Sequence, residues 1–108
     1  MNFTELQEYI GENYCNAISV KELAQQTHMS VRNFSRVFRK VYGLPPGSYV
    51  NQVRIQQACQ LLQDPWISVS EVAWACGFQD SNYFTRQFKA ASGYSPREYR
   101  KRIMEQPV

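Results

Sequence analysis

The amino-acid sequence predicts an all-α protein of about seven helices, arranged as two helix-turn-helix lobes joined by a long linker helix. Three observations support this fold class. Apolar residues recur at i, i+3, i+4 and i+7, which is the spacing of one face of an α-helix. No segment alternates apolar and polar residues over the length of a strand. One part of the chain is also repeated about 50 residues further on.

The repeat consists of two matched blocks. Residues 18–24 (ISVKELA) and 67–73 (ISVSEVA) agree at five of seven positions with an offset of 49. The offset then becomes 50, and the recurring pairs are Phe34/Phe84, Arg36/Arg86, Phe38/Phe88, Gly43/Gly93, Pro46/Pro96 and Tyr49/Tyr99. The extra residue falls around residues 77–80, where a turn can absorb it. Duplication of a plain helical hairpin with no shared function is the alternative interpretation.

The first lobe, about residues 1–45, is predicted to contain three helices. The first covers about residues 3–14, and its apolar stripe consists of Phe3, Leu6, Ile10 and Tyr14. Ser19 and Glu22 have the spacing of a capping box and begin a second helix, which ends near residues 27–29. Ser30 caps a third helix, and Gly43 ends it. The apolar stripe of this third helix consists of Phe34, Val37, Phe38 and Val41.

The linker helix is predicted over about residues 46–63. It follows Pro45, and Pro46 is tolerated because the first turn of a helix needs no amide donor. The helix ends at Asp64-Pro65, since the residue before a proline avoids helical geometry. Its apolar arc is wide enough for burial against two bodies, so we expect it to bridge the two lobes.

The second lobe, about residues 64–108, repeats this plan. Ser68 and Glu71 form a capping box, Gly77 supplies the turn, Asp80 caps the next helix and Gly93 ends it. We expect the inward residues of this lobe to be Val69, Val72, Ala73, Cys76, Phe84, Phe88 and Ala91. A last helix begins near Pro96 and carries Tyr99 together with a basic run.

The aromatic residues of the second lobe have two interpretations. Trp66 and Trp74, with Tyr83 and Tyr94, could form a stacking platform for single-stranded nucleic acid. Packing of the lobe is the interpretation that we favour.

The net charge of +3 hides two basic clusters. Residues 31–40 contain four basic residues and no acidic one, and residues 86–102 contain six basic residues and one acidic residue. The segments 1–30 and 41–85 carry net charges of −3 and −2. Two basic clusters in acidic surroundings are the pattern expected for two contacts with a polyanion.

Several functional classes lack their signals. No run approaches the roughly 18 apolar residues of a membrane span, and the N-terminus does not resemble a signal peptide. The chain has neither a CxxC motif nor a nucleotide-binding glycine motif, and its one histidine, His28, has no catalytic partner beside it. We therefore expect no enzyme, cofactor or metal site, and His28 to be a turn residue. We expect the three cysteines (Cys15, Cys59 and Cys76) to be buried thiols that form no disulfide, which suits a reducing cytoplasm.

The second helix of a helix-turn-helix unit can lie in the major groove of DNA. The outward faces of the two candidate recognition helices, about residues 31–42 and 81–92, lack acidic residues, which would repel phosphates. Arginine suits guanine, asparagine suits adenine, and lysine suits phosphates. The outward residues are Arg32, Ser35, Arg36 and Arg39, with Asn33 and Lys40 beside them, and Ser81, Asn82, Thr85, Arg86 and Lys89.

The chain resembles the DNA-binding domain of the AraC/XylS family of bacterial transcription regulators, in the plan of the short MarA and SoxS type. The matching segments are residues 54–62 (RIQQACQLL), 67–73, 77–89 (GFQDSNYFTRQFK) and 93–100 (GYSPREYR). The resemblance covers nearly all of residues 5–102. It implies two helix-turn-helix units bound to successive major-groove segments on one face of DNA, about 34 Å apart.

Matched by position, the resemblance implies that Arg32, Ser35 and Arg36 read bases from the first recognition helix, and that Asn82, Thr85 and Arg86 read them from the second. Contacts with the DNA backbone are expected from Arg39, Lys40, Ser81 and Lys89. Two departures matter. Some relatives have a tryptophan at the position of Arg32, so their first half-site preference does not carry over. Pro45 adds a second proline after Gly43, which stiffens the entry to the linker helix.

The predicted function is that of a sequence-specific transcription regulator, an activator, acting on double-stranded DNA in the bacterial cytoplasm at the nucleoid. RNA polymerase is a partner implied by the resemblance alone. Many relatives carry a sensor or dimerisation domain before this one. Because the first helix begins almost at Met1, the chain is either a free-standing regulator or a fragment. The alternatives are a helical protein-interaction adaptor and a non-specific architectural DNA-binding protein.

Two groups of basic residues have structural interpretations. Arg54 lies within the apolar arc of the linker helix, so we expect it to pair with a lobe carboxylate such as Glu22 or Glu71 rather than with DNA. The run from Arg97 to Arg102 is expected to form a solvated helix face, with phosphate contact as the alternative.

Overall fold

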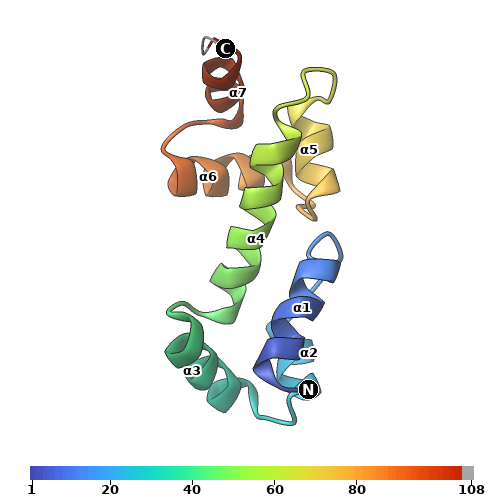
Figure 1. Ribbon diagram of the computed structural model, residues 1–108, viewed down its shortest axis with the longest axis vertical. Helices are drawn as coiled ribbons and strands as arrows, with labels where there is room; N and C mark the ends of the chain where they lie inside the picture. The colour runs from blue at the N-terminus through green and yellow to red at the C-terminus, as the bar shows by residue number, and fades with distance from the viewer. Residues whose placement is uncertain (106–108) are drawn as a thin grey trace. The chain divides into compact units, whose positions relative to one another are not determined.

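The computed structural model describes residues 1–105, and within that range it contains seven α-helices and no strand (Figure 1). The predicted all-α fold class is confirmed. The chain divides into two compact units, Met1–Val53 and Arg54–Val108, and the boundary falls inside the fourth helix. Each unit has its own apolar core.

The first unit contains α1 (Phe3–Asn13), α2 (Val20–Gln26), α3 (Val31–Tyr42) and the first half of α4 (Pro46–Leu61). The first three helices begin at residues whose side chains accept a backbone N–H, as expected for N-caps. Asn2 accepts from Glu5 at 2.8 Å, Ser19 from Glu22 at 3.1 Å and Ser30 from Asn33 at 3.2 Å. The caps at Ser19 and Ser30 are confirmed. Gly43 ends α3 with a φ of 84°, also as predicted.

Aromatic rings close the core of the first unit. Phe34 and Phe38 are fully buried, and the ring of Tyr42 lies 4.6 Å from Phe38 and 5.3 Å from Tyr49. The Tyr42 hydroxyl donates to the Phe3 carbonyl at 2.8 Å, which joins the end of α3 to the start of α1. Burial, with a smaller contribution from Tyr49, raises the pKa of Tyr42. The complete core consists of Leu6, Ile10, Leu23, Ala24, Phe34, Phe38 and Val50.

Two residues of the predicted α3 stripe, Val37 and Val41, lie outside this core, and Val37 is half-buried. The expectation for Val41 was wrong, because its side chain is 55% exposed. Tyr42 and the incoming ring of Tyr49 already cover Phe38 at the last turn of the helix, and Val41 is left outside them.

The turn between α2 and α3 contains a strained residue. His28 has a φ of 60°, and the corresponding turn between α5 and α6 has Gly77 with a φ of 93°. A side chain at positive φ is unfavourable because Cβ crowds the following carbonyl, whereas glycine has no Cβ. His28 is therefore a turn residue, as predicted, and it carries a conformational cost that its counterpart avoids.

Replacing His28 with glycine is expected to stabilise the first unit by about 0.5–1 kcal/mol. The relief of backbone strain, roughly 1–2 kcal/mol, exceeds the greater entropy that glycine adds to the unfolded chain. Thermal or urea unfolding of His28→Gly measures this change. The matched Gly77→His variant should lose stability, and an unchanged or lower midpoint for His28→Gly would contradict the assignment of strain.

The helix α4 supplies residues to both cores, and Figure 1 shows it in green as one continuous helix. Val50 packs in the first unit, whereas Ile55 and Ala58 pack in the second. The helix ends at Leu61, two residues before the predicted end, and Leu62 follows it as a fully buried residue.

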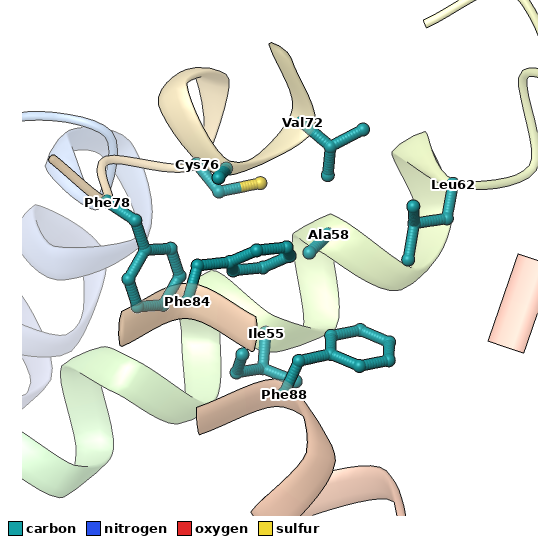
Figure 2. Close-up of a cluster of buried hydrophobic side chains, with 9 residues drawn as sticks. Ile55, Ala58, Leu62, Val72, Cys76, Phe78, Phe84 and Phe88 are labelled. Atoms are coloured by element: carbon teal, nitrogen blue, oxygen red, sulfur yellow. The ribbon is translucent and has the colours of Figure 1, made fainter. Parts of the chain in front are cut away.

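The second unit adds α5 (Val69–Ala75), α6 (Ser81–Ser92) and α7 (Pro96–Glu105). Ser68 accepts from Glu71 N–H at 3.1 Å, and Asp80 accepts from the Asn82 and Tyr83 amides at 2.8 and 3.3 Å. Both predicted caps are confirmed. Figure 2 shows side chains from α4, α5 and α6 pointing toward one another around Phe84 and Phe88. Among the described residues of this unit, the buried members of the core are Ile55, Ala58, Leu62, Val72, Ala73, Cys76, Phe78, Phe84 and Phe88.

Several residues expected inside the second unit lie at its surface. Trp66 is 91% exposed and Trp74 is 75% exposed, so the expectation that they pack the lobe was wrong. The buried face of the short helix α5 is filled by Val72 and Ala73, which leaves Trp74 on the other side. Trp66 lies in the preceding loop, where its backbone N–H donates to the Asp64 carboxylate at 2.9 Å. Ala91 is also exposed, because Phe88 is covered by the ring of Tyr99 instead.

The cysteines differ in their surroundings. Cys76 is buried, as predicted, and it lies in the core of the second unit. Cys59 is half-buried beside Tyr99, whose pKa is raised chiefly by a hydrogen bond with Cys59 and further by burial. The prediction for Cys15 was wrong, because this residue is exposed in the turn that follows α1.

The helix α7 is fastened to the loop between α4 and α5 by Arg100. Its Nε donates to the Leu62 carbonyl at 3.0 Å, and one terminal nitrogen donates to the carbonyls of Asp64 and Ile67. The expectation that the whole run from Arg97 to Arg102 is a solvated face was therefore wrong for Arg100. No local pattern signals this role, because the acceptors are backbone carbonyls 33 to 38 residues earlier in the chain.

Candidate nucleic-acid interface

The helices α3 and α6 are built to the same pattern. Both contain 12 residues, begin directly after a side-chain cap and end at a glycine in the left-handed conformation. The amides of Gly43 and Gly93 both donate at 2.8 Å to the carbonyl four residues earlier. Residues 50 apart in the sequence therefore occupy equivalent helix positions. Eight of the ten predicted site residues fall into matched pairs: Arg32/Asn82, Ser35/Thr85, Arg36/Arg86 and Arg39/Lys89. The other two, Lys40 and Ser81, have Ala90 and Val31 at the equivalent positions.

In the first unit, α3 turns its aromatic face inward and its polar face outward. Phe34 and Phe38 are buried, and Ser35 is half-buried at the edge of the exposed face. No acidic residue lies between Val31 and Tyr42. The exposed basic residues are Arg32, Arg36, Arg39 and Lys40, so the structure brings all predicted contact residues of this helix to one surface.

Arg36 is held in place by a neighbour on this surface. One of its terminal nitrogens donates to the Asn33 side-chain oxygen at 2.8 Å, and both residues are exposed. Their i, i+3 spacing places them side by side on a helix. The sequence places Asn33 beside the predicted readers without indicating a role for it, and the i, i+3 spacing from Arg36 is the signal that could reveal one.

In the second unit, α6 presents a less basic surface. Ser81, Asn82, Arg86 and Lys89 are exposed, and Thr85 is half-buried. The Thr85 hydroxyl donates to the Ser81 carbonyl at 2.9 Å, so its oxygen can still accept a hydrogen bond from a base or a water. No acidic residue lies within α6, and the Asp80 carboxylate before it is occupied by two backbone amides.

Several basic residues outside α3 and α6 have partners within their own unit. The Arg102 guanidinium lies 4.3 Å from the centre of the Tyr94 ring, and Lys101 forms an exposed 4.0 Å ion pair with Glu105. Arg54 lies 5.8 Å from the centre of the Phe78 ring, which fits a packing role. Its pairing with Glu22 or Glu71 stays a prediction.

The exposed faces of α3 and α6 combine guanidinium and ammonium groups with side-chain amides and hydroxyls. These groups can bind phosphate oxygens and the donor and acceptor pattern of base edges. Within residues 1–105, no group of three or more histidine, cysteine or acidic residues is placed to hold a metal ion. In the same part of the chain, no helix has the length and apolar character needed to cross a membrane.

Comparison with known proteins identifies the family. A family model of a helix-turn-helix domain matches residues 23–102. The chain is 38% identical over 104 residues to the uncharacterized HTH-type transcriptional regulator YijO of Escherichia coli K12, and 35% identical over 92 residues to the HTH-type transcriptional activator RhaS of Escherichia fergusonii. The chain belongs to the AraC/XylS family of transcription regulators.

Solved structures of AraC-type domains share this fold. The DNA-binding domain of AdpA, in complex with a target DNA, superposes with a TM-score of 0.87 and 33% identity, covering 93% of this chain and 90% of that one. An AraC-type regulator from Chromobacterium violaceum gives a TM-score of 0.83 and 27% identity, covering 96% of this chain and 93% of that one.

The relatives are longer proteins. The matched regions cover 96% of this chain but 37% of YijO, and 85% of this chain but 33% of RhaS. The chain therefore spans about a third of the length of these curated relatives.

Proposed function

We propose that this AraC/XylS-family chain binds duplex DNA in a sequence-specific manner and regulates transcription as an activator. The observation that carries the proposal is the matched pair of helices α3 and α6, which present polar, acid-free faces in the same register. Two relatives support the proposal: the DNA-binding domain of AdpA was solved in complex with a target DNA, and RhaS is a transcriptional activator.

In this proposal, each recognition helix enters one of two successive major-groove segments. Arg32, Ser35 and Arg36 read bases in one segment, and Asn82, Thr85 and Arg86 read bases in the next. The remaining site residues bind phosphates and fix the register on the duplex (Arg39, Lys40, Ser81 and Lys89). Arginine pairs best with guanine O6 and N7, whereas asparagine pairs with adenine N6 and N7.

The setting of this activity is part of the same proposal. The chain acts at DNA in the bacterial cytoplasm, at the nucleoid, and RNA polymerase is the partner through which an activator works. We assign it no catalytic activity and no cofactor. The two lobes and the linker helix together form one double helix-turn-helix domain.

Selection of duplexes from a random pool tests the proposal. We expect two short motifs whose centres lie about ten base pairs apart, because that spacing is one turn of B-DNA. Raising the salt from 50 to 200 mM should weaken binding steeply, since each neutralised phosphate releases condensed counterions. Recovery of no motif would contradict sequence-specific reading. Equal binding to all duplexes would instead favour an architectural role, and no binding at all would favour a protein adaptor.

Two variants on α6 serve as the internal control of this experiment. Arg86→Ala should relax the preference at one base pair by about 1–3 kcal/mol, because it removes a donor to a base edge. Lys89→Ala should weaken binding to all duplexes alike and reduce the salt dependence, because it removes a phosphate contact. An equal loss on every sequence from both variants would refute the assigned roles.

A further inference from the structure

The side chain of Arg36 is the one predicted base reader that the structure shows hydrogen-bonded to another side chain. Its terminal nitrogen Nη2 donates to Asn33 Oδ1 at 2.8 Å on the exposed surface of α3. The backbone of Asn33 is itself fixed, because its amide donates to the N-cap hydroxyl of Ser30 at 3.2 Å. The acceptor for Arg36 therefore stands on the first turn of the helix, where the backbone is held by the cap.

This bond restrains a long side chain without exhausting its donors. A guanidinium carries five N–H groups in a planar fork, and the contact with Asn33 uses one of them. The others remain available to the two acceptors of a guanine edge. Immobilising an exposed arginine on binding costs conformational entropy, and a side chain that is already held has less of this entropy to lose.

The second unit lacks this arrangement. Arg86 is the counterpart of Arg36, and Tyr83 is the counterpart of Asn33. Tyr83 has no carboxamide, and its ring lies 6.1 Å from that of Phe78. The two recognition arginines therefore occupy the same helix position but have different neighbours.

We propose that Asn33 is a positioning residue that sharpens the base preference of Arg36, so that the two helix-turn-helix units read DNA with unequal stringency. The inference rests on the proposed function, because it assumes that α3 reads bases. It assigns to Asn33 no base contact of its own. Asn33 holds the guanidinium plane in one orientation. Affinity for a duplex with the correct base pair then increases more than affinity for a duplex with a mismatched one.

The test measures affinities for two duplexes that differ in one base pair. That pair is the position at which Arg36→Ala lowers the discrimination most while leaving part of it. Asn33→Ala should lower the ratio of the two affinities about two- to tenfold, because the arginine must then be ordered on binding. In the Arg36→Ala background, the same change should leave the ratio unaltered. The matched Tyr83→Ala variant should also leave this ratio unaltered.

A conservative variant separates positioning from a structural role. Asn33→Asp keeps an oxygen acceptor for Arg36, so the ratio should stay within about twofold of the wild type. Its added negative charge should weaken binding to both duplexes, more so at low salt. Thermal unfolding of each variant shows whether α3 remains folded.

Three results would overturn the inference. One is an Asn33→Ala variant that folds and keeps the full ratio. Another is an equal loss of the ratio in the Arg36→Ala background. The third is an Asn33→Asp variant whose affinity ratio falls as far as that of Asn33→Ala. A wild-type protein that prefers no duplex sequence would show a different failure, that of the proposed function itself.

Discussion

Replacing Arg100 with methionine is expected to lower the stability of the second unit by about 2–4 kcal/mol. Arg100 donates from Nε to the Leu62 carbonyl and from a terminal nitrogen to two further carbonyls of the α4–α5 loop. Hydrogen bonds from a charged donor contribute more than neutral ones, and their removal takes the Arg100 donor from the Leu62 and Ile67 carbonyls, whose contacts with Arg100 are partly buried. Methionine keeps much of the apolar part of the side chain, so the loss of stability measures the contribution of the guanidinium group alone.

The position of Arg100 at the end of α4 adds to this effect. The last carbonyls of a helix have no partner within it, and they carry the negative end of the helix dipole. Leu62 directly follows α4, so the Arg100 cation both satisfies its carbonyl and lies at the favourable end of that dipole. Lysine can supply the charge but not the planar fork, so Arg100→Lys should recover part of the loss.

Chemical denaturation with spectroscopic detection measures this change. The matched control is Arg97→Met on the same helix, where the side chain is exposed, and it should alter stability by less than about 0.5 kcal/mol. Hydrogen exchange should show that amide protection decreases in the α4–α5 loop and in α7 and does not change in the first unit. Equal effects of Arg97→Met and Arg100→Met would show that stability depends on the positive charge in general and not on the hydrogen bonds of Arg100.

The contrast between Ser30 and Arg100 shows what the sequence could reveal. Ser30, Asp80 and Gly43 act on their own helix ends, so their roles follow from local spacing and were predictable. Arg100 acts on carbonyls in another part of its unit, and backbone acceptors leave no mark in the sequence. Its role becomes visible when the loop geometry is known.

The exposed tryptophans illustrate a second limit. An apolar side chain predicts burial in general, but burial needs a facing surface that is not already occupied. The small residue Ala73 lies close against the core with Val72, and Trp74 on the next position points elsewhere. The outward placement of the candidate site residues was easier to predict, because outward helix positions follow directly from the inward ones, whereas their contacts with DNA stay predictions. The structure places all ten predicted DNA-contacting residues on α3 and α6, at exposed or half-buried positions.

Phe34→Ala is expected to cost about 3–5 kcal/mol, and the loss should be confined to the first unit. Phe34 is fully buried, so the substitution removes its transfer free energy and leaves a cavity. A unit of this size is marginally stable, and a loss of that magnitude is enough to unfold it. The cores of the two units share no residue, although α4 contributes to both. The second unit should therefore remain folded.

The matched control is the equivalent variant Phe84→Ala, which should unfold the second unit and leave the first unit folded. Hydrogen exchange followed residue by residue should lose protection in α1–α3 for Phe34→Ala, and in α5–α7 for Phe84→Ala. If both variants lower protection uniformly along the chain, the two units unfold as one cooperative body.

Duplex selection with the same two variants connects this result to the proposed function. Each variant should retain the motif read by the intact unit and lose the other, because an unfolded unit cannot place its recognition helix in a groove. The assignment of α3 and α6 to separate half-sites therefore requires that Phe34→Ala and Phe84→Ala retain different motifs. Retention of the same motif by both would contradict it.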